Sequence, residues 1–476
     1  PQGAVAIGGR DVVAVGTADD VLAAWEAPQV VDCEGAAILP GLINAHSHVP
    51  MSLLRGLADD LRLDVWLMGF MLPVEREFVG PAFCRWGTLL SCAEMIRSGV
   101  TCFADMYYYE HEVAQAASEA GLRAICAETI LKWPTPDAES YDEGLALCQQ
   151  FIEAWKDHPL VIPAVGPHSP EMGTPELLGD AARLAIEHDV PLLIHINETA
   201  TGAEEAEALY GVTAVDALQQ FGVLEARVLA AHCVHITPEE RDLLATHGAG
   251  VAHNPTSNLK LASGVADVVG MLEAGIAVGI GTDGQASNND QDMFEEMRLA
   301  ALLPKGIRLD PTALPARQAL AMATIGGARA LGLEEITGSL EVGKRADIAV
   351  LDLDPVHNSP RFSLSPDNLY SQVVYASKAH DVQHVLVDGR WLMRDRELLT
   401  LDEAEVRTEA QRIATQVGAF LARREQSLLD KLVALGTLQW TETYEVQVKV
   451  WVPDEAAVVD RLLACPQVMV IKPSER

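Results

Sequence analysis

Eight short apolar segments follow one another at similar intervals between residues 38 and 284, and five of them are followed within two residues by His or Asp. The segments span residues 38–45, 100–104, 123–130, 160–165, 191–194, 228–231, 248–252 and 277–281. Parallel strands that are buried on both faces have continuous apolar sequences of this kind. The pattern therefore predicts an α/β protein with a (β/α)8 TIM-like barrel over residues 38–337.

Outside the barrel, both ends of the chain predict antiparallel strands. Residues 1–37 and 338–400 contain short alternating segments separated by glycines, with a turn at Asp388-Gly389. We expect these two regions to meet in one small β-domain that flanks the barrel. Residues 401–476 are expected to form a C-terminal extension, in which a long amphipathic helix precedes a β-α-β segment over residues 437–476.

Composition and charge narrow the choice of partners. A chain of 476 residues with 49% hydrophobic residues can bury one large core and still supply a second domain. A net charge of −34 opposes binding to nucleic acid, and the absence of a long uncharged apolar segment argues against a membrane span. We expect a small-molecule substrate and a homo-oligomer.

The two ends of the sequence and its cysteines bear on location. The N-terminus has no basic segment followed by an apolar one, so we predict no signal peptide, and because it lacks Met we expect further residues upstream. The 8 cysteines are scattered without CxxC pairs, which is typical of reduced thiols in a cytoplasmic protein.

The residues that follow the apolar segments predict a metal site. His46 and His48 stand two positions apart after the first segment, where strand alternation points both side chains to one face. His195, His232 and Asp283 follow the fifth, sixth and eighth segments. A single His-x-His pair could merely cap a strand, but the active sites of barrels lie at the C-terminal ends of strands, where these residues should converge.

Six motifs along the chain resemble those of a known family. They are PGLINAHSH, GPHSP, IHINET, AHCVH, HNPTSNLKL and GTDGQASNN. In order and position they resemble the amidohydrolase superfamily, and more closely its branch of 5′-methylthioadenosine/S-adenosylhomocysteine deaminases and s-triazine hydrolases. The resemblance extends from about residue 4 to about residue 430.

The resemblance implies that His46, His48, His195 and Asp283 bind one divalent metal ion. Three imidazoles and a carboxylate suit zinc, with iron as the alternative, whereas calcium and magnesium prefer more oxygen ligands. Two-metal members of the superfamily use a bridging lysine at the end of the fourth strand. Residues 161–168 contain no lysine, so we expect a single ion.

The same resemblance gives catalytic roles to Glu198, His232 and Asp283. A carboxyl group at Glu198 can donate a proton to a ring nitrogen of an aminated heterocycle and so make the adjacent carbon more electrophilic. His232 and Asp283 can accept a proton from water, and Asp283 can pass it to the departing amine. The structural alternatives are a carboxylate at a helix N-terminus for Glu198 and a backbone-bonded imidazole for His232.

Substrate contacts are implied for Trp66, Glu75 and His168, and for Glu198 through its proton. The matching histidine of the deaminases contacts the ribose side of the nucleoside, and the segment that matches Trp66 and Glu75 closes over the base and grips the ribose hydroxyls. Trp66 could instead belong to the core and Glu75 to a solvated helix face. Residues 253–260 are expected to shape the pocket wall.

These residues predict a hydrolytic deaminase that converts 5′-methylthioadenosine, adenosine or S-adenosylhomocysteine to its inosine product and ammonia. Deaminases that accept homocysteine place arginines after the third strand, but residues 130–143 contain no arginine and only Lys132 as a cation. A neutral substrate therefore fits better than one with a carboxylate.

Two alternatives stay open. One is a triazine or other heterocycle hydrolase, although removing chloride does not need the ring protonation that Glu198 offers. The other is a non-catalytic barrel with a structural metal, although structural zinc sites are closed by four Cys or His ligands.

Overall fold

The structure is a computed structural model that describes residues 3–33, 35–61, 65–362, 364–365 and 367–434. The chain divides into two compact parts, residues 1–415 and 416–476. Helix α17 (Glu403–Ala434) confirms the predicted C-terminal helix. The predicted β-α-β segment lies outside the described residues. Among the described helices, none combines the length and the apolar character needed to cross a bilayer.

Eight parallel strands form the barrel predicted from the apolar segments. They follow one another around the sheet in chain order: β4 (Leu42–Ser47), β5 (Val100–Tyr107), β6 (Arg123–Ile130), β7 (Val161–Pro167), β8 (Pro191–Ile196), β9 (Arg227–His232), β10 (Gly250–His253) and β11 (Val278–Ile280). The first and last strands meet through the residues that follow β11. Asp283 N donates to His46 O at 3.0 Å, and Thr282 N donates to Asn44 Oδ1 at 3.0 Å.

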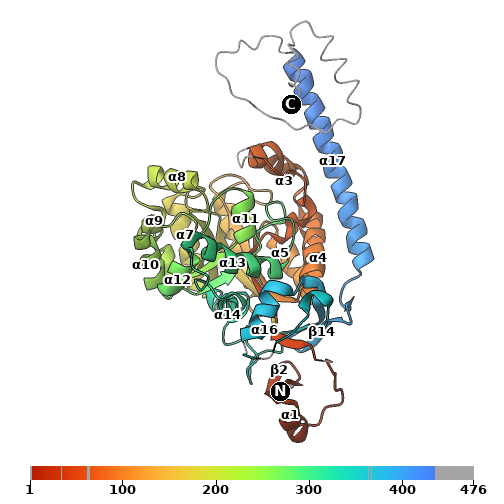
Figure 1. Ribbon diagram of the computed structural model, residues 1–476. Coiled ribbons are helices and arrows are strands. Elements are labelled where there is room, and N and C mark those ends of the chain that lie inside the picture. The colour runs from red at the N-terminus through yellow and green to blue at the C-terminus, as the bar shows by residue number, and fades with distance from the viewer. Residues whose placement is uncertain (1–2, 34, 62–64, 363, 366, 435–476) are drawn as a thin grey trace, which may run out of the picture. The chain divides into compact units, whose positions relative to one another are not determined.

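Helices cover the outside of the barrel (Figure 1). They are α4 (Pro81–Arg97), α5 (Glu110–Ala120), α6 (Tyr141–Trp155), α7 (Pro175–His188), α8 (Ala200–Tyr210), α9 (Ala214–Gln220), α10 (Pro238–Thr246), α12 (Val268–Glu273), α13 (Met293–Arg308), α14 (Ala316–Ala321) and α15 (Gly327–Ala330). Several begin at a hydroxyl residue that caps the first turn, as Ser140 does for α6 and Thr237 for α10. Short segments after the strands form η1 (Val49–Leu54), η2 (Trp66–Met71), α3 (Leu72–Phe78) and α11 (Pro255–Lys260).

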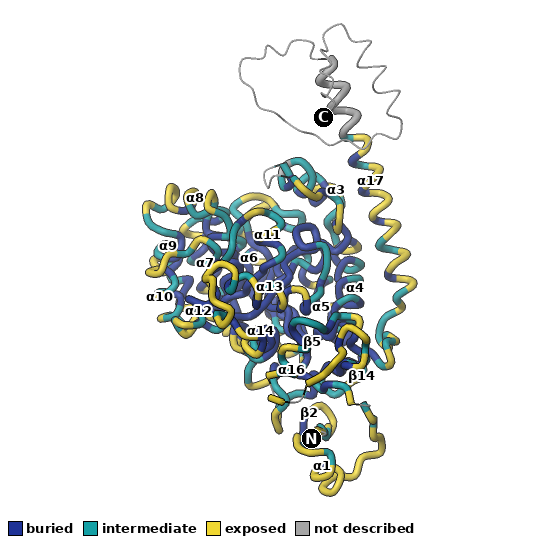
Figure 2. The backbone as a smooth tube through the Cα atoms, in the orientation of Figure 1, coloured by how far each residue is buried: buried dark blue, intermediate teal, exposed yellow. Residues whose placement is uncertain are grey.

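The barrel strands are almost wholly buried, as their dark blue colour in Figure 2 shows. The interior is filled largely by small and branched side chains, among them Ile43, Ala104, Ile125, Leu193 and Ala252. Close packing of this kind fixes the positions of the strand ends. The polar residues that follow the strands are therefore held by a rigid scaffold.

The first predicted strand, residues 38–45, is wrong in one respect. The structure divides it at Gly41 into β3 (Ala37–Pro40), which lies outside the barrel, and β4. A Cβ atom at Gly41 would lie 2.0 Å from Thr101 Oγ1, so any larger residue at this passage between the sheets would force Thr101 to move.

Strands from both ends of the chain meet beside the barrel, as expected. β3 pairs with β12 (Ile348–Leu351) in a five-stranded antiparallel sheet that continues through β13 (Val382–Val387), β14 (Arg390–Arg394) and β15 (Glu397–Leu398). β1 (Gly3–Gly8) and β2 (Asp11–Thr17) form a separate hairpin, followed by α1 (Ala18–Ala24). Val12 of this hairpin packs in one cluster with Ile348 and Leu386. The domain limits at residues 37 and 338 stay predictions.

Candidate metal centre

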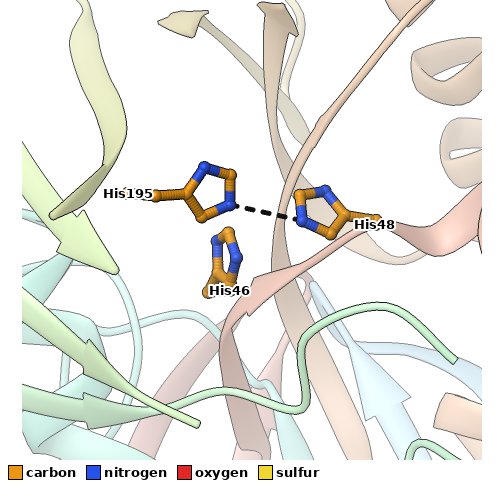
Figure 3. Close-up of side chains that lie close together, drawn as sticks. All are labelled: His46, His48 and His195. Carbon is orange, nitrogen blue, oxygen red and sulfur yellow. Dashed lines mark hydrogen bonds between the residues drawn. The ribbon is translucent and has the colours of Figure 1, made fainter. Parts of the chain in front are cut away.

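Three histidines converge at the C-terminal ends of β4 and β8 (Figure 3). The Nε2 atoms of His48 and His195 lie 3.3 Å apart, and the ring of His46 has its centroid 4.9 Å from that of His48 and 5.0 Å from that of His195. Nitrogen ligands at about 2.0–2.1 Å around a tetrahedral zinc ion are separated by about 3.3 Å. The predicted convergence of these three imidazoles is therefore present in the fold.

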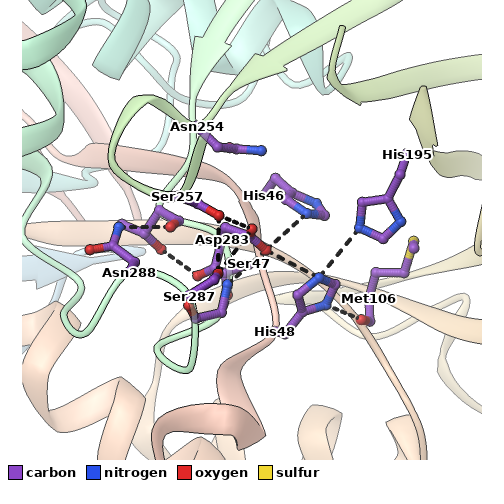
Figure 4. Close-up of polar contacts among 12 residues, drawn as sticks. His46, Ser47, His48, Met106, His195, Asn254, Ser257, Asp283, Ser287 and Asn288 are labelled. Carbon is purple, nitrogen blue, oxygen red and sulfur yellow. Dashed lines mark hydrogen bonds and ion pairs between the residues drawn. The ribbon is translucent and has the colours of Figure 1, made fainter. Parts of the chain in front are cut away.

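The Asp283 carboxylate faces the same point. Its Oδ1 lies 3.2 Å from His48 Nε2 and 3.6 Å from His46 Nε2. Its Oδ2 accepts hydrogen bonds from Ser257 Oγ at 2.6 Å and Ser287 Oγ at 3.1 Å, which fix the direction of the carboxylate (Figure 4). Burial alone would raise the pKa of Asp283, but the neighbouring imidazoles of His46 and His48 hold it well below the usual range.

The backbone presents the metal-binding nitrogen of two of the rings. Met106 O lies 2.5 Å from Nδ1 of His48, and His168 O lies 2.7 Å from Nδ1 of His195. A ring that donates through Nδ1 keeps the lone pair of Nε2 for a cation. These carbonyl groups therefore prepare both Nε2 atoms as ligands.

His46 also has the properties of a metal ligand. The residue is 1% exposed, and neither ring nitrogen has a hydrogen-bond partner. Burial lowers the pKa of His46 to about 4, so at pH 7 the ring is in the neutral form that binds metals. Burial lowers the pKa of His48, but the Asp283 carboxylate outweighs this effect and raises it to about 9. A cation that binds His48 therefore displaces a proton. The donor set suits a divalent metal ion.

His232 lies beside this group but turns toward different partners. Its ring centroid lies 5.5 Å from that of His46, and its Nδ1 lies 2.9 Å from Asn258 Oδ1. The ring is therefore held by a side-chain amide, not by the backbone contact that the structural alternative supposed. Its Nε2 lies 3.9 Å from Glu198 Oε2.

Glu198 lies between β8 and α8, beside His232. The helix takes Thr199 as its cap, whose hydroxyl accepts from Gly202 N at 3.0 Å, so Glu198 does not cap the helix as its structural alternative supposed. Its side chain is 28% exposed. Burial raises the pKa of Glu198 above its usual value, although His232 opposes the shift. The carboxyl is thus biased toward the protonated form.

The predicted substrate contacts differ in their positions. His168 lies next to the metal centre, with its ring centroid 4.6 Å from that of His195, and burial lowers its pKa to about 3. Glu75 is 9% exposed and accepts a hydrogen bond from Tyr107 OH at 2.7 Å, so it does not lie on a solvated helix face. The Tyr107 ring centroid lies 6.3 Å from that of His48. Trp66 is 9% exposed in η2, and its place near the substrate stays a prediction.

Some residues of the site carried little or no signal in the sequence. The carbonyl groups of Met106 and His168 could not be found, because every residue carries one. Ser257 and Asn258 lie in the segment expected to shape the pocket wall, but they bind Asp283 and His232. Their hydroxyl and amide groups in the HNPTSN motif were the available signal.

The fold and site define a barrel protein whose strand ends assemble a divalent metal centre of three histidines and one aspartate. The family profile of the Amidohydrolase family matches residues 37–392, and the chain belongs to this family. This membership confirms the family predicted from the motifs, and with it the hydrolase class.

Relatives with assigned activities match most of the chain. A 5-methylthioadenosine/S-adenosylhomocysteine deaminase of Syntrophobacter fumaroxidans is 44% identical over 87% of this chain and 93% of its own length. The protein of that name from Moorella thermoacetica is 44% identical over 85% of this chain and 93% of its own length.

Solved structures of zinc-containing enzymes share this fold. An adenosine deaminase from Xanthomonas campestris with bound zinc superposes with a TM-score of 0.85 at 38% identity, over 88% of this chain and 94% of that one. Atrazine chlorohydrolase from Arthrobacter aurescens, complexed with zinc, gives a TM-score of 0.78 at 27% identity, over 86% of this chain and 94% of its own.

Proposed function

We propose that this protein is a hydrolytic deaminase of adenosine-type nucleosides, which converts 5′-methylthioadenosine, adenosine or S-adenosylhomocysteine to the inosine product and ammonia. The observation that carries the proposal is the position of the partly exposed Glu198, whose carboxylate lies 3.9 Å from His232 Nε2 beside the metal centre. An acid beside a base at a metal centre is what hydrolytic removal of an amino group from a heterocycle requires. The names of relatives at 40–44% identity support the choice of substrate.

We further propose that His46, His48, His195 and Asp283 hold one ion, and that this ion is zinc. The donor set is nitrogen-rich, and β7 (Val161–Pro167) offers no lysine that could bridge a second ion. When bound, zinc would lower the pKa of a coordinated water to about 7. The zinc in two solved relatives supports the choice of metal.

The residues of the chain would divide the proton transfers. Glu198, biased toward its protonated form by burial, donates to a ring nitrogen of the base. His232 presents Nε2 because Asn258 holds its Nδ1, and it accepts a proton from the attacking water. Asp283, which its low pKa leaves ionised, accepts the remaining proton of that water oxygen and passes it to the departing amine. The products are the inosine-type keto nucleoside and ammonia.

Glu75, His168 and Trp66 are proposed to bind the nucleoside. Glu75 uses one oxygen for Tyr107 OH, and its second oxygen can accept from a ribose hydroxyl. Lys132 is already engaged, because its Nζ donates to Glu171 O at 2.7 Å and lies 4.5 Å from the centroid of the Trp133 ring. A substrate carboxylate would have to displace these contacts, so a neutral nucleoside is favoured.

A substrate comparison tests the proposal. The zinc-loaded protein is incubated with 5′-methylthioadenosine, adenosine, S-adenosylhomocysteine and a chlorotriazine, and released ammonia and chloride are measured. We expect ammonia from the nucleosides, with a higher kcat/KM for the two neutral ones. Chloride from the triazine without ammonia from any nucleoside would favour the heterocycle-hydrolase alternative and overturn the proposal. The homo-oligomeric state and the cytoplasmic location stay predictions.

A further inference from the structure

We propose that His357, His380 and Asp381 form a second, peripheral site for a divalent transition-metal ion, apart from the barrel centre. His357 lies in η5 (Val356–Asn358), and the other two lie in η7 (Ala379–Asp381), just before β13. One ligand atom from each of the three lies within 4.8 Å of the others. In the part of the chain that the structure describes, the other groups with this property all belong to the barrel centre.

Asp381 is the anchor of this site. The residue is 1% exposed, and its Oδ2 accepts from His357 Nε2 at 2.7 Å, Lys378 N at 2.9 Å and Asn358 Nδ2 at 3.4 Å. Its Oδ1 is buried and has no hydrogen-bond partner. Burying a carboxylate oxygen removes its contacts with water, and this costs free energy when no hydrogen-bond donor replaces them. One oxygen thus serves the fold, and the other lacks a partner that a cation would provide.

His380 is the proposed second ligand, and it lies next to the Oδ1 atom of Asp381. Its Nε2 lies 3.5 Å from Asp381 Oδ1, which is too long for a good hydrogen bond. Two ligands of a tetrahedral ion with bonds of about 2.1 Å are separated by about 3.4 Å. The His380 side chain is 71% exposed, so it can adjust to admit the ion.

His357 supplies the third ligand after a change of tautomer. Without a cation its Nε2 donates to Asp381 Oδ2, but moving the proton to Nδ1 presents a lone pair at Nε2 with no change in net charge. The ring centroids of His357 and His380 lie 5.6 Å apart, so both rings can reach one ion. Because His357 is 36% exposed, water can take the fourth position.

The surroundings set the type and strength of binding. Two imidazoles and a carboxylate select zinc, nickel or copper over calcium or magnesium. Arg396 donates from Nη1 to Ala379 O at 3.3 Å and Val382 O at 2.8 Å, which places a positive charge behind η7 and opposes a cation. The net charge of −34 acts in the other direction. Three protein ligands and an open fourth position therefore give weaker binding than the buried barrel centre.

Equilibrium dialysis of the full chain against Zn²⁺, followed by elemental analysis, tests the site. Wild-type protein should bind about one ion tightly and a second at higher zinc, whereas the variant His380→Gln should stop at about one. His247→Gln is the matched control, because His247 pairs with the carboxylate of Glu225 at 3.7 Å, and this pair contains only one imidazole. The His247→Gln variant should keep both ions. Asp381 is left unchanged because its Oδ2 holds the local fold.

A spectroscopic readout identifies the ligands. After the tight site has been filled with zinc, one equivalent of Cu²⁺ should give an electron paramagnetic resonance spectrum with hyperfine splitting from two imidazole nitrogens, which His380→Gln reduces to one. Failure of a second ion to bind, or a second ion that persists unchanged in His380→Gln, would overturn the proposal. These measurements do not depend on deaminase activity, so their outcome is separate from that of the proposed function.

Discussion

The substitution Glu198→Gln tests the proposed proton donor most directly. Glutamine has the shape of the protonated carboxyl, and the side chain is 28% exposed, so the amide can occupy the same space. What it loses is the transferable proton. General acid catalysis is worth about 10²–10⁴-fold, so kcat/KM should fall by that factor, equivalent to about 2.7–5.4 kcal/mol of transition-state stabilisation.

The assay follows ammonia release from adenosine together with zinc content. Metal content should stay at the wild-type level, because Glu198 is not among the proposed ligands. Glu205→Gln makes the same side-chain change at an exposed position on α8 and should leave turnover unchanged. Near-normal turnover of Glu198→Gln with full metal content would remove this residue from the mechanism, and an equal loss of metal and activity would assign it a structural role.

The pH dependence adds a second check on the same residue. Burial raises the pKa of Glu198, and the protonated form is the active one, so wild-type activity should fall as pH rises through that pKa. The variant should lack this alkaline limb. An unchanged limb in Glu198→Gln would assign the titration to another group.

Three further predictions concern stability. Burial raises the pKa of Glu296 to about 8, so the folded chain keeps a proton that the unfolded chain releases near pH 4.3, and stability from this group falls by about 1.36 kcal/mol per pH unit between those values. Glu296→Gln should flatten the pH dependence of urea unfolding, and an unchanged slope would contradict this origin. A Cβ atom at Gly41 would lie 2.0 Å from Thr101 Oγ1, so Gly41→Ala should destabilise the fold by about 1–3 kcal/mol, whereas Gly306→Ala in α13, with no atom within 4 Å, should stabilise it slightly; equal effects on the two midpoints would refute the packing argument. Zinc at 100 times its dissociation constant should stabilise the folded chain by about 2.7 kcal/mol, so chelation of the barrel metal should lower the melting temperature. An unshifted melting curve would argue against the metal centre.

Most of the fold followed from hydrophobic patterning, because strands buried on both faces leave a strong local signal. The first strand shows the limit of that signal. Residues 38–43 are continuously apolar, yet the chain changes sheets at Gly41, where Thr101, a residue distant in sequence, leaves no room for a Cβ atom. Patterning within a segment cannot reveal which sheet each half joins.

The candidate site was predictable to the extent that its chemistry resides in distinctive side chains. Imidazoles and carboxylates after strands indicated His46, His195 and Asp283, and the structure brings them together. The groups that orient them could not be predicted in the same way. The carbonyl of Met106 and the hydroxyl of Ser257 gain their roles only from tertiary position.

The residues that close the barrel are also proposed metal ligands. β4 and the segment after β11 are joined by the hydrogen bond from Asp283 N to His46 O, between two of the proposed ligands. A shift of the backbone at either residue would thus disturb both the closure of the barrel and the position of a proposed metal ligand. Substrate preference can therefore change with least effect on stability through substitutions in the loops after the strands, which leave the hydrogen bond between Asp283 and His46 unchanged.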